Sequence, residues 1–180
     1  AEKLLDQAGL SRGANGARMT RSLSLVTANL SPFKEIAPVL QEQLRLVGLE
    51  TEVVLLAPVD YTKRVIQEQN FDLALTNGTW GPDPDNLNVR FGSQGANQFM
   101  GYASAEFDAA LAEGARKATL SERAQAYFRA QEILARDLPL APLAEYVQLI
   151  IVRDNVTGLP QLEARGLVTF QDYSLVRLKR

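Results

Sequence analysis

Residues 71–102, FDLALTNGTWGPDPDNLNVRFGSQGANQFMGY, decide how this chain is organised. They open with a short apolar run, Phe71 to Thr76, which is typical of a buried strand. A long segment rich in Gly, Pro, Asn and Asp follows, and it holds the only tryptophan, Trp80. A loop of this length is uncommon in a compact domain unless it is functional or disordered. Its aromatic, amide and carboxylate groups are those of ligand sites, so we interpret it as half of a binding cleft.

Strand and helix patterns alternate before this stretch. Arg21–Ala28 alternates apolar and polar residues, Glu50–Leu56 is β-branched at its centre, and Phe71–Thr76 follows as a third strand. Apolar residues recur at helical spacing from Phe33 to Val47, and a second helix is expected to run to about Gln69. This order predicts an α/β lobe with a mostly parallel central sheet and helices on both faces. In such sheets, ligands bind beyond the carboxyl ends of the strands, where the long loop begins.

Capping residues predict where the helices begin. Ser31 is expected to cap the helix over Phe33–Val47, with Pro32 at its first position. Asp60 is expected to cap the helix that runs to about Gln69. After the loop, Ser104 and Ser121 are expected to cap two more helices. Two further strands are predicted, over 147–153 and 167–178. The chain begins at Ala1, without Met and in a helical pattern, so we expect it to be a piece of a longer polypeptide.

Composition excludes several kinds of function. The 180 residues suit one domain or lobe, and a net charge of −2 with scattered Lys and Arg gives no support for nucleic-acid binding. The chain has no Cys and no His. Zinc sites of the Cys/His type and nucleophiles activated by histidine are therefore excluded within it. We expect no cofactor, no metal site and no catalytic residue.

Several residues of the loop, Asn97 among them, have both a functional and a structural interpretation. Trp80 would stack on a ligand or fill the core, and the two are about equally supported. Asp83 and Asp85, in PDPDN, would anchor a cation or set up a turn with Asn86. We favour the turn for Asp85 and Asn86 and leave Asp83 open. A hydrolase using both aspartates is disfavoured, because glycosidase carboxylates face each other across the scissile bond. The glycines of Gly92-Ser93-Gln94-Gly95 do not follow a strand, as a dinucleotide site requires.

Several stretches resemble, in order, family 5 of the extracytoplasmic solute-binding proteins, the receptors of peptide- and nickel-type ABC importers. They are AEKLLDQAGL, APVLQEQLRLVGLETEVVLLAPVDYTKRV, FDLALTNGTWGPDPDN, RFGS, NQFMGYASAEFDAAL and ERAQAYFRAQEILARDLPLAPL. The resemblance runs through nearly the whole chain and corresponds to the carboxy-terminal lobe of these receptors. It implies a periplasmic-binding-protein-like lobe, a periplasmic location, a membrane permease as partner and an amino-terminal lobe elsewhere in the same polypeptide.

The resemblance also implies how a solute is held. In peptide-binding members, an Asp in this loop pairs with the α-ammonium of the peptide. One alignment places Thr79 at that position, and a gapped alignment places Asp83 there; both remain open. The implied function is capture of a peptide or a related small solute by a cleft that closes. The alternatives are a sensor lobe of a transcriptional regulator, a carboxylate-dependent hydrolase and a module that binds protein chains. The predicted ligand-binding residues are Asn77, Thr79, Trp80, Asp83 and Asn97.

Overall fold

The computed structural model describes residues 1–78, 83–145, 151–158 and 176–178. The chain divides into two compact units, and each is considered by itself. Unit 1 comprises residues 1–78 and 96–102, and unit 2 comprises residues 79–95 and 103–180. None of the helices in the described ranges is long and apolar enough to cross a membrane.

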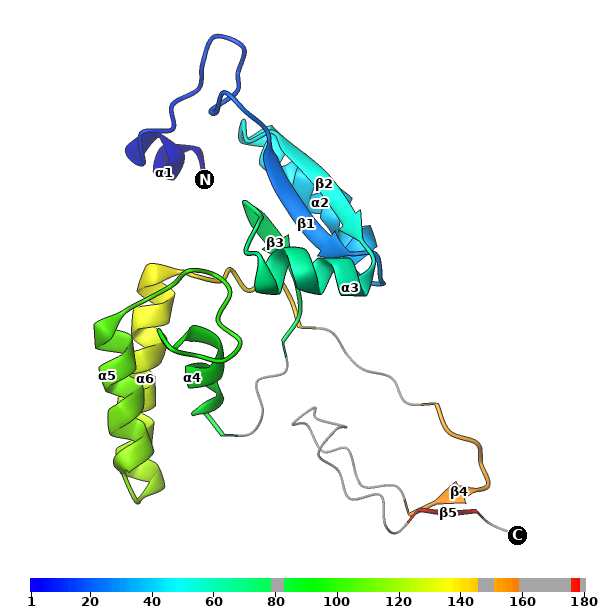
Figure 1. Ribbon diagram of the computed structural model, residues 1–180, viewed down its shortest axis with the longest axis vertical. Coiled ribbons are helices and arrows are strands. Elements are labelled where there is room, and N and C mark those ends of the chain that lie inside the picture. Colours follow the sequence, from blue (N-terminus) through cyan, green and yellow to red (C-terminus); the bar gives the residue numbers. More distant parts are fainter. Residues whose placement is uncertain (79–82, 146–150, 159–175, 179–180) are drawn as a thin grey trace. The chain divides into compact units, whose positions relative to one another are not determined.

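Unit 1 contains a parallel sheet of three strands (Figure 1). The strands are β1 (Leu23–Ala28), β2 (Thr51–Leu56) and β3 (Leu73–Leu75), and β1 lies in the centre. Leu25 of β1 is opposite Val53 on one side and Leu73 on the other. The helices of this unit are α1 (Glu2–Gln7), α2 (Phe33–Leu46) and α3 (Pro58–Tyr61), which continues as the π-helix η1 (Thr62–Gln67). The predicted α/β class and parallel sheet are confirmed.

Alternation along the strands gives the sheet two apolar faces. Leu25 and Leu75 point to the face where Ala37 of α2 is buried, and Phe33, Ile36 and Leu40 complete that cluster. The next residue, Val26, points to the opposite face, where it packs with Val65 of η1 and with Phe99. Because successive strand residues point to opposite sides, one apolar strand needs cover on both faces. The helices on both faces supply that cover, as predicted.

Unit 2 is built on a helical hairpin (Figure 1). Its helices are α4 (Asn86–Phe91), α5 (Ala105–Arg116) and α6 (Leu120–Asp137), and it also contains the short antiparallel pair β4 (Val156–Thr157) and β5 (Arg177–Leu178). Phe107 and Leu111 of α5 and Ala126, Tyr127, Ala130 and Ile133 of α6 are buried. Phe91 of α4 meets Phe107 edge to face, with ring centroids 6.4 Å apart. The hairpin thus forms the core of this unit.

Several boundaries differ from the prediction. Pro32, not Ser31, is at the N-cap of α2, and the Ser31 hydroxyl donates instead to the Glu35 carboxylate at 2.8 Å. Asp60 lies inside α3, which begins at Pro58, a residue suited to a first turn because it lacks an N–H. Ser104 caps α5 as predicted, by accepting from the Phe107 N–H. Thr119, rather than Ser121, caps α6.

The segment after β3 is not one continuous loop, since α4 lies within it. Of the predicted strand 147–153, residues 147–150 lie outside the described residues and residues 151–153 form no strand. Most of the predicted strand 167–178 also lies outside them, and its described end contains β5.

Candidate functional site

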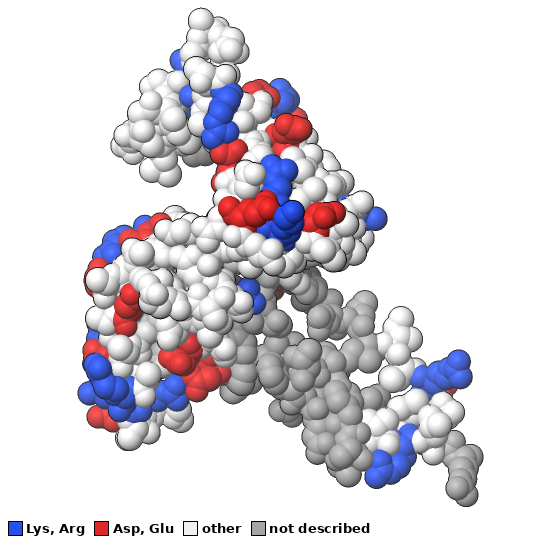
Figure 2. All heavy atoms as spheres, in the orientation of Figure 1, with Lys and Arg blue, Asp and Glu red and all other residues white. Residues whose placement is uncertain are grey.

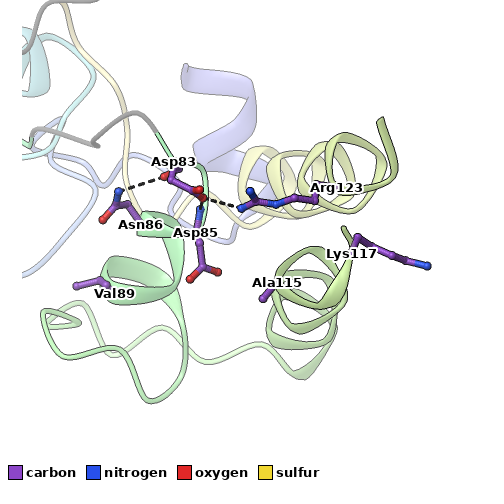
Figure 3. Close-up of a pocket in the computed structure, with 7 residues that line it drawn as sticks. All are labelled: Asp83, Asp85, Asn86, Val89, Ala115, Lys117 and Arg123. Atoms are coloured by element: carbon purple, nitrogen blue, oxygen red, sulfur yellow. Dashed lines mark hydrogen bonds and ion pairs between the residues drawn. The ribbon is translucent and has the colours of Figure 1, made fainter. Parts of the chain in front are cut away.

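A shallow, open hollow of about 420 Å³ lies within unit 2 (Figure 3). One side is the turn before α4 with the first turn of that helix, and the other is the end of α5 with the start of α6. Its lining combines two acidic and two basic groups with an amide and two apolar residues: Asp83, Asp85, Asn86, Val89, Ala115, Lys117 and Arg123.

The PDPDN sequence builds the acidic side of this hollow. The Asp83 carboxylate accepts a hydrogen bond from the Asp85 N–H at 2.9 Å. The Asn86 N–H and side-chain amide each donate to the Asp83 carbonyl at 3.1 Å. A short Asp side chain bonding the backbone two residues ahead is typical turn chemistry. The turn predicted for Asp85 and Asn86 is therefore present, and it starts α4.

Arg123 of α6 holds this turn against the hairpin. Its Nη2 lies 2.8 Å from Oδ1 of Asp83, and the pair joins residues 40 positions apart. The guanidinium also stands over the Tyr127 ring, 5.5 Å from the centroid, and the Tyr127 hydroxyl donates to Asp85 at 3.2 Å. The two aspartates are thus anchored to successive turns of one helix face (Figure 3 shows the Arg123–Asp83 pair).

These contacts favour the charged forms of Asp83 and Arg123. The Asp85 N–H, followed by the Arg123 guanidinium, lowers the pKa of Asp83 from 3.8. Bonds from Arg123 to the Tyr127 hydroxyl and to Asp83 raise the pKa of the guanidinium. Burial raises the pKa of the Tyr127 hydroxyl. The site therefore holds Asp83 as a carboxylate and Arg123 as a cation, and it suits binding of polar groups.

The shift of Asp83 argues against acid catalysis by this residue. A general acid needs a carboxyl group whose pKa is raised toward the working pH, and the pKa of Asp83 moves the other way. The described residues also contain no group of three or more Asp, Glu, His or Cys side chains that could hold a metal ion.

The described residues among the five predicted ligand residues belong to both units of the chain. Asn77 and Asn97 are exposed residues of unit 1, whereas Asp83 is a half-exposed residue of unit 2. Thr79 and Trp80 lie outside the described residues. The role of all five as ligand contacts stays a prediction.

Sequence reasoning missed the basic side of the hollow, Lys117 and Arg123. Arg123 and Tyr127 are four residues apart on a helix, a spacing that places them on the same face. That spacing was visible, but the partner of Arg123 was not, because it depends on how α4 packs on the hairpin.

The glycines of Gly92-Ser93-Gln94-Gly95 have a packing role. A Cβ on Gly92 would come within 2.6 Å of the Asn88 carbonyl oxygen, and one on Gly95 within 2.4 Å of the same atom. The Ser93 N–H donates to Asp108 of α5 at 3.0 Å. These residues fold the chain tightly around the end of α4.

The chain is similar to several known proteins. Residues 1–99 match the family "Bacterial extracellular solute-binding proteins, family 5 Middle". The peptide transport periplasmic protein SapA of Salmonella typhimurium is 31% identical over 138 residues, which are 73% of this chain and 24% of SapA. Heme-binding protein A of Haemophilus influenzae is 29% identical over 169 residues, 89% of this chain and 30% of that protein.

A solved structure has the same fold. The ABC transporter-associated periplasmic binding protein DppA of Helicobacter pylori, in complex with the peptide STSA, superposes with a TM-score of 0.80 at 24% identity. The match covers 99% of this chain and 34% of DppA. The chain thus spans about a quarter to a third of the length of these relatives. Like SapA, it is a periplasmic protein. Since the family match extends over more than half of its residues, the chain belongs to family 5 of the bacterial extracellular solute-binding proteins.

Proposed function

We propose that the complete protein is the solute-binding component of an ABC importer, and that these 180 residues form its carboxy-terminal lobe. The solute is a peptide or a related small molecule. The observation that best supports this proposal is the family match over residues 1–99. The matched region includes the parallel sheet and the segment that follows β3 after Leu75. In parallel α/β sheets, this carboxyl edge is where ligands bind. SapA is named for peptide transport, and DppA was solved with a bound peptide.

The mechanism is closure of two lobes around the solute, followed by delivery to a membrane permease. Asn77, Thr79, Trp80, Asp83 and Asn97 supply stacking and hydrogen bonds from this lobe. An amino-terminal lobe of the same polypeptide supplies the remaining contacts. The solute favours the closed state by the difference between its affinities for the closed and open states. Half a cleft buries only part of a ligand, so this lobe alone binds weakly.

The solute class is the variable part of this proposal. The names of the relatives include both peptide and heme. A chain without histidine is a poor source of ligands for a nickel ion, which imidazole suits well. A peptide therefore remains our first expectation.

Native mass spectrometry of the full-length receptor, purified without refolding, tests the function directly. A bound mass that is released intact on denaturation supports a receptor and gives the solute class. A bound mass released as cleaved products would favour the hydrolase. Absence of any bound mass, together with no thermal shift across peptides, sugars, heme and metal chelates, would contradict solute capture.

A further inference from the structure

A buried hydroxyl group of unit 1 lies at the point where β3 ends. Thr27 of the central strand β1 is fully buried, and its Oγ1 donates a hydrogen bond to the Leu75 carbonyl at 2.9 Å. Thr27 and Leu75 are opposite each other in the parallel pair of β1 and β3, and Leu75 is the last residue of β3. The bond therefore joins the central strand to the residue from which the chain leaves the sheet.

The environment of Thr27 is apolar. Residues two apart on a strand point to the same face, which places Thr27 beside Leu25 on the side of the sheet that α2 covers. Valine has a similar branched shape and would fill this position without a polar group. A buried hydroxyl costs free energy unless it is hydrogen-bonded, and the bond to the Leu75 carbonyl offsets that cost. The hydroxyl thus has its role at the end of β3.

Strand pairing holds β3 over a shorter length than it holds β2. The strands β1 and β2 are six residues long and pair along their whole length. β3 has three residues, and its pairing with β1 stops at Thr27 and Leu75, one residue before β1 ends. The side chain of Thr27 therefore adds a hydrogen bond at the position where the pairing of β3 stops.

We propose that Thr27 is a positioning residue for solute binding, because its hydroxyl fixes the direction in which the chain leaves β3. This inference rests on the proposed function, in which the solute binds at the carboxyl edge of the sheet. Asn77, one of the predicted solute contacts, lies two residues after Leu75. Groups that bind a ligand must be held within about 0.5 Å of the productive geometry, and a backbone shift at Leu75 displaces Asn77 directly.

Two variants of the full-length receptor separate the hydroxyl from the shape of the side chain. Thr27→Val removes the hydrogen bond and keeps the branched shape, whereas Thr27→Ser keeps a hydroxyl. Hydrogen exchange of the amides of residues 75–78, relative to their intrinsic rates, measures how firmly the chain is held there. Their protection should fall about three- to tenfold in Thr27→Val, as for loss of one hydrogen bond, and should be restored in Thr27→Ser. The amides paired between β1 and β2 should keep their wild-type protection.

Thr51→Val is the matched control within the same sheet. Thr51 begins β2 at the amino edge, it is 8% exposed, and its Oγ1 has no hydrogen-bond partner in the part of the chain that the structure describes. Removing this hydroxyl should leave the protection of residues 75–78 at the wild-type level. Equal protection of these residues in wild type and Thr27→Val overturns the proposal. An equal fall throughout the sheet also overturns it, because it would indicate a general loss of stability.

Affinity for a peptide probe tests the link to solute binding. Isothermal titration of the receptor with trialanine should give an affinity about three- to tenfold weaker in Thr27→Val, and wild-type affinity in Thr27→Ser and Thr51→Val. Unchanged affinity in Thr27→Val overturns the positioning role even where hydrogen exchange has changed. A wild-type receptor that binds no trialanine counts against peptide capture alone, since hydrogen exchange still decides whether Thr27 fixes the chain where it leaves β3.

Discussion

Arg123 Nη2 and Asp83 Oδ1 lie 2.8 Å apart, and this ion pair joins the first turns of α6 to the turn that starts α4. Asp83 also accepts the Asp85 N–H, so its carboxylate already has a structural task. The residue that one alignment makes the anchor for a peptide ammonium is therefore engaged inside its own unit. An ammonium group would have to share this carboxylate with Arg123 or displace it.

The pKa of Asp83 in the full receptor is expected to be below 3.8 and to rise when Arg123 is removed. Its rise in Arg123→Met should be partial, because the Asp85 N–H is the larger cause of the shift and remains in place. A group whose folded pKa is lowered stabilises the fold above its unfolded pKa, and that contribution is lost as the pH falls. Titration of the Asp83 carboxyl carbon by NMR measures both values. An identical pKa in wild type and variant would contradict the pairing.

Gly114→Ala is expected to destabilise the α5–α6 hairpin. A Cβ at this position would lie 2.8 Å from Cε2 and Cζ of the buried Tyr127 ring. Overpacking costs roughly 1–3 kcal/mol, whereas replacing a helical glycine by alanine gains about 0.5–1 kcal/mol, so a net loss of about 1–2 kcal/mol is expected. Chemical unfolding of the full receptor measures it.

The Tyr127→Ala background is the matched control for that change. Without the ring, Gly114→Ala meets no clash and should become stabilising through helix propensity alone. The same destabilisation in both backgrounds would show that the close approach of Gly114 to Tyr127 is not the cause.

Asp72→Asn is expected to loosen β3 at its amino end. Asp72 receives two bonds from Arg21, at 2.5 and 2.9 Å, and one from the Ser24 N–H at 2.8 Å. These contacts hold the pairing of β1 with β3, and they lower the pKa of Asp72, first through Arg21 and then through Ser24. The protection of the Leu73–Leu75 amides against hydrogen exchange, relative to their intrinsic exchange rates, should fall in the variant. In wild type this protection should fall when Asp72 is protonated at low pH.

Arg45→Gln is the control for the Asp72 variant, since it removes an exposed ion pair with Glu42 within α2. Exchange in β3 should stay at the wild-type rate. Equal acceleration in both variants would mean that charge loss in general, rather than the contacts of Asp72, controls this strand.

The sheet was predictable because the apolar pattern that indicates each strand lies within a few consecutive residues. The alternating order of strands and helices, with near-continuous apolar runs in the strands, already predicts a parallel sheet with helices on both faces. The start of α6 was predictable too, but the wrong residue was chosen. Thr119 accepts the Glu122 N–H, and its hydroxyl donates to the Glu122 carboxylate at 2.7 Å. This Thr-x-x-Glu capping box is present in the sequence, and it indicates Thr119 as the N-cap more strongly than a single serine indicates Ser121.

The candidate site was less accessible to sequence reasoning. The α4 helix is short, and the Pro and Asp residues before it favour a loop interpretation. The partner of Asp83 lies 40 positions away, and no local pattern indicates a contact between segments that meet only through packing. The acidic side of the hollow could be predicted because its Pro and Asp residues are typical of a turn. Arg123 could not be predicted as a site residue because its neighbours in the sequence are those of an ordinary helix surface.

Solute affinity in two matched variants separates the two roles of Asp83. Asp83→Asn and Arg123→Met both abolish the ion pair, but only the first removes the carboxylate. If Asp83 anchors a peptide ammonium, Asp83→Asn should weaken binding by about tenfold or more, as for loss of a charged hydrogen bond, whereas Arg123→Met should leave it unchanged or tighter. Isothermal titration of the full receptor with its solute measures both. Equal effects in the two variants would assign Asp83 to the turn alone and favour the alignment that places Thr79 at the anchor position.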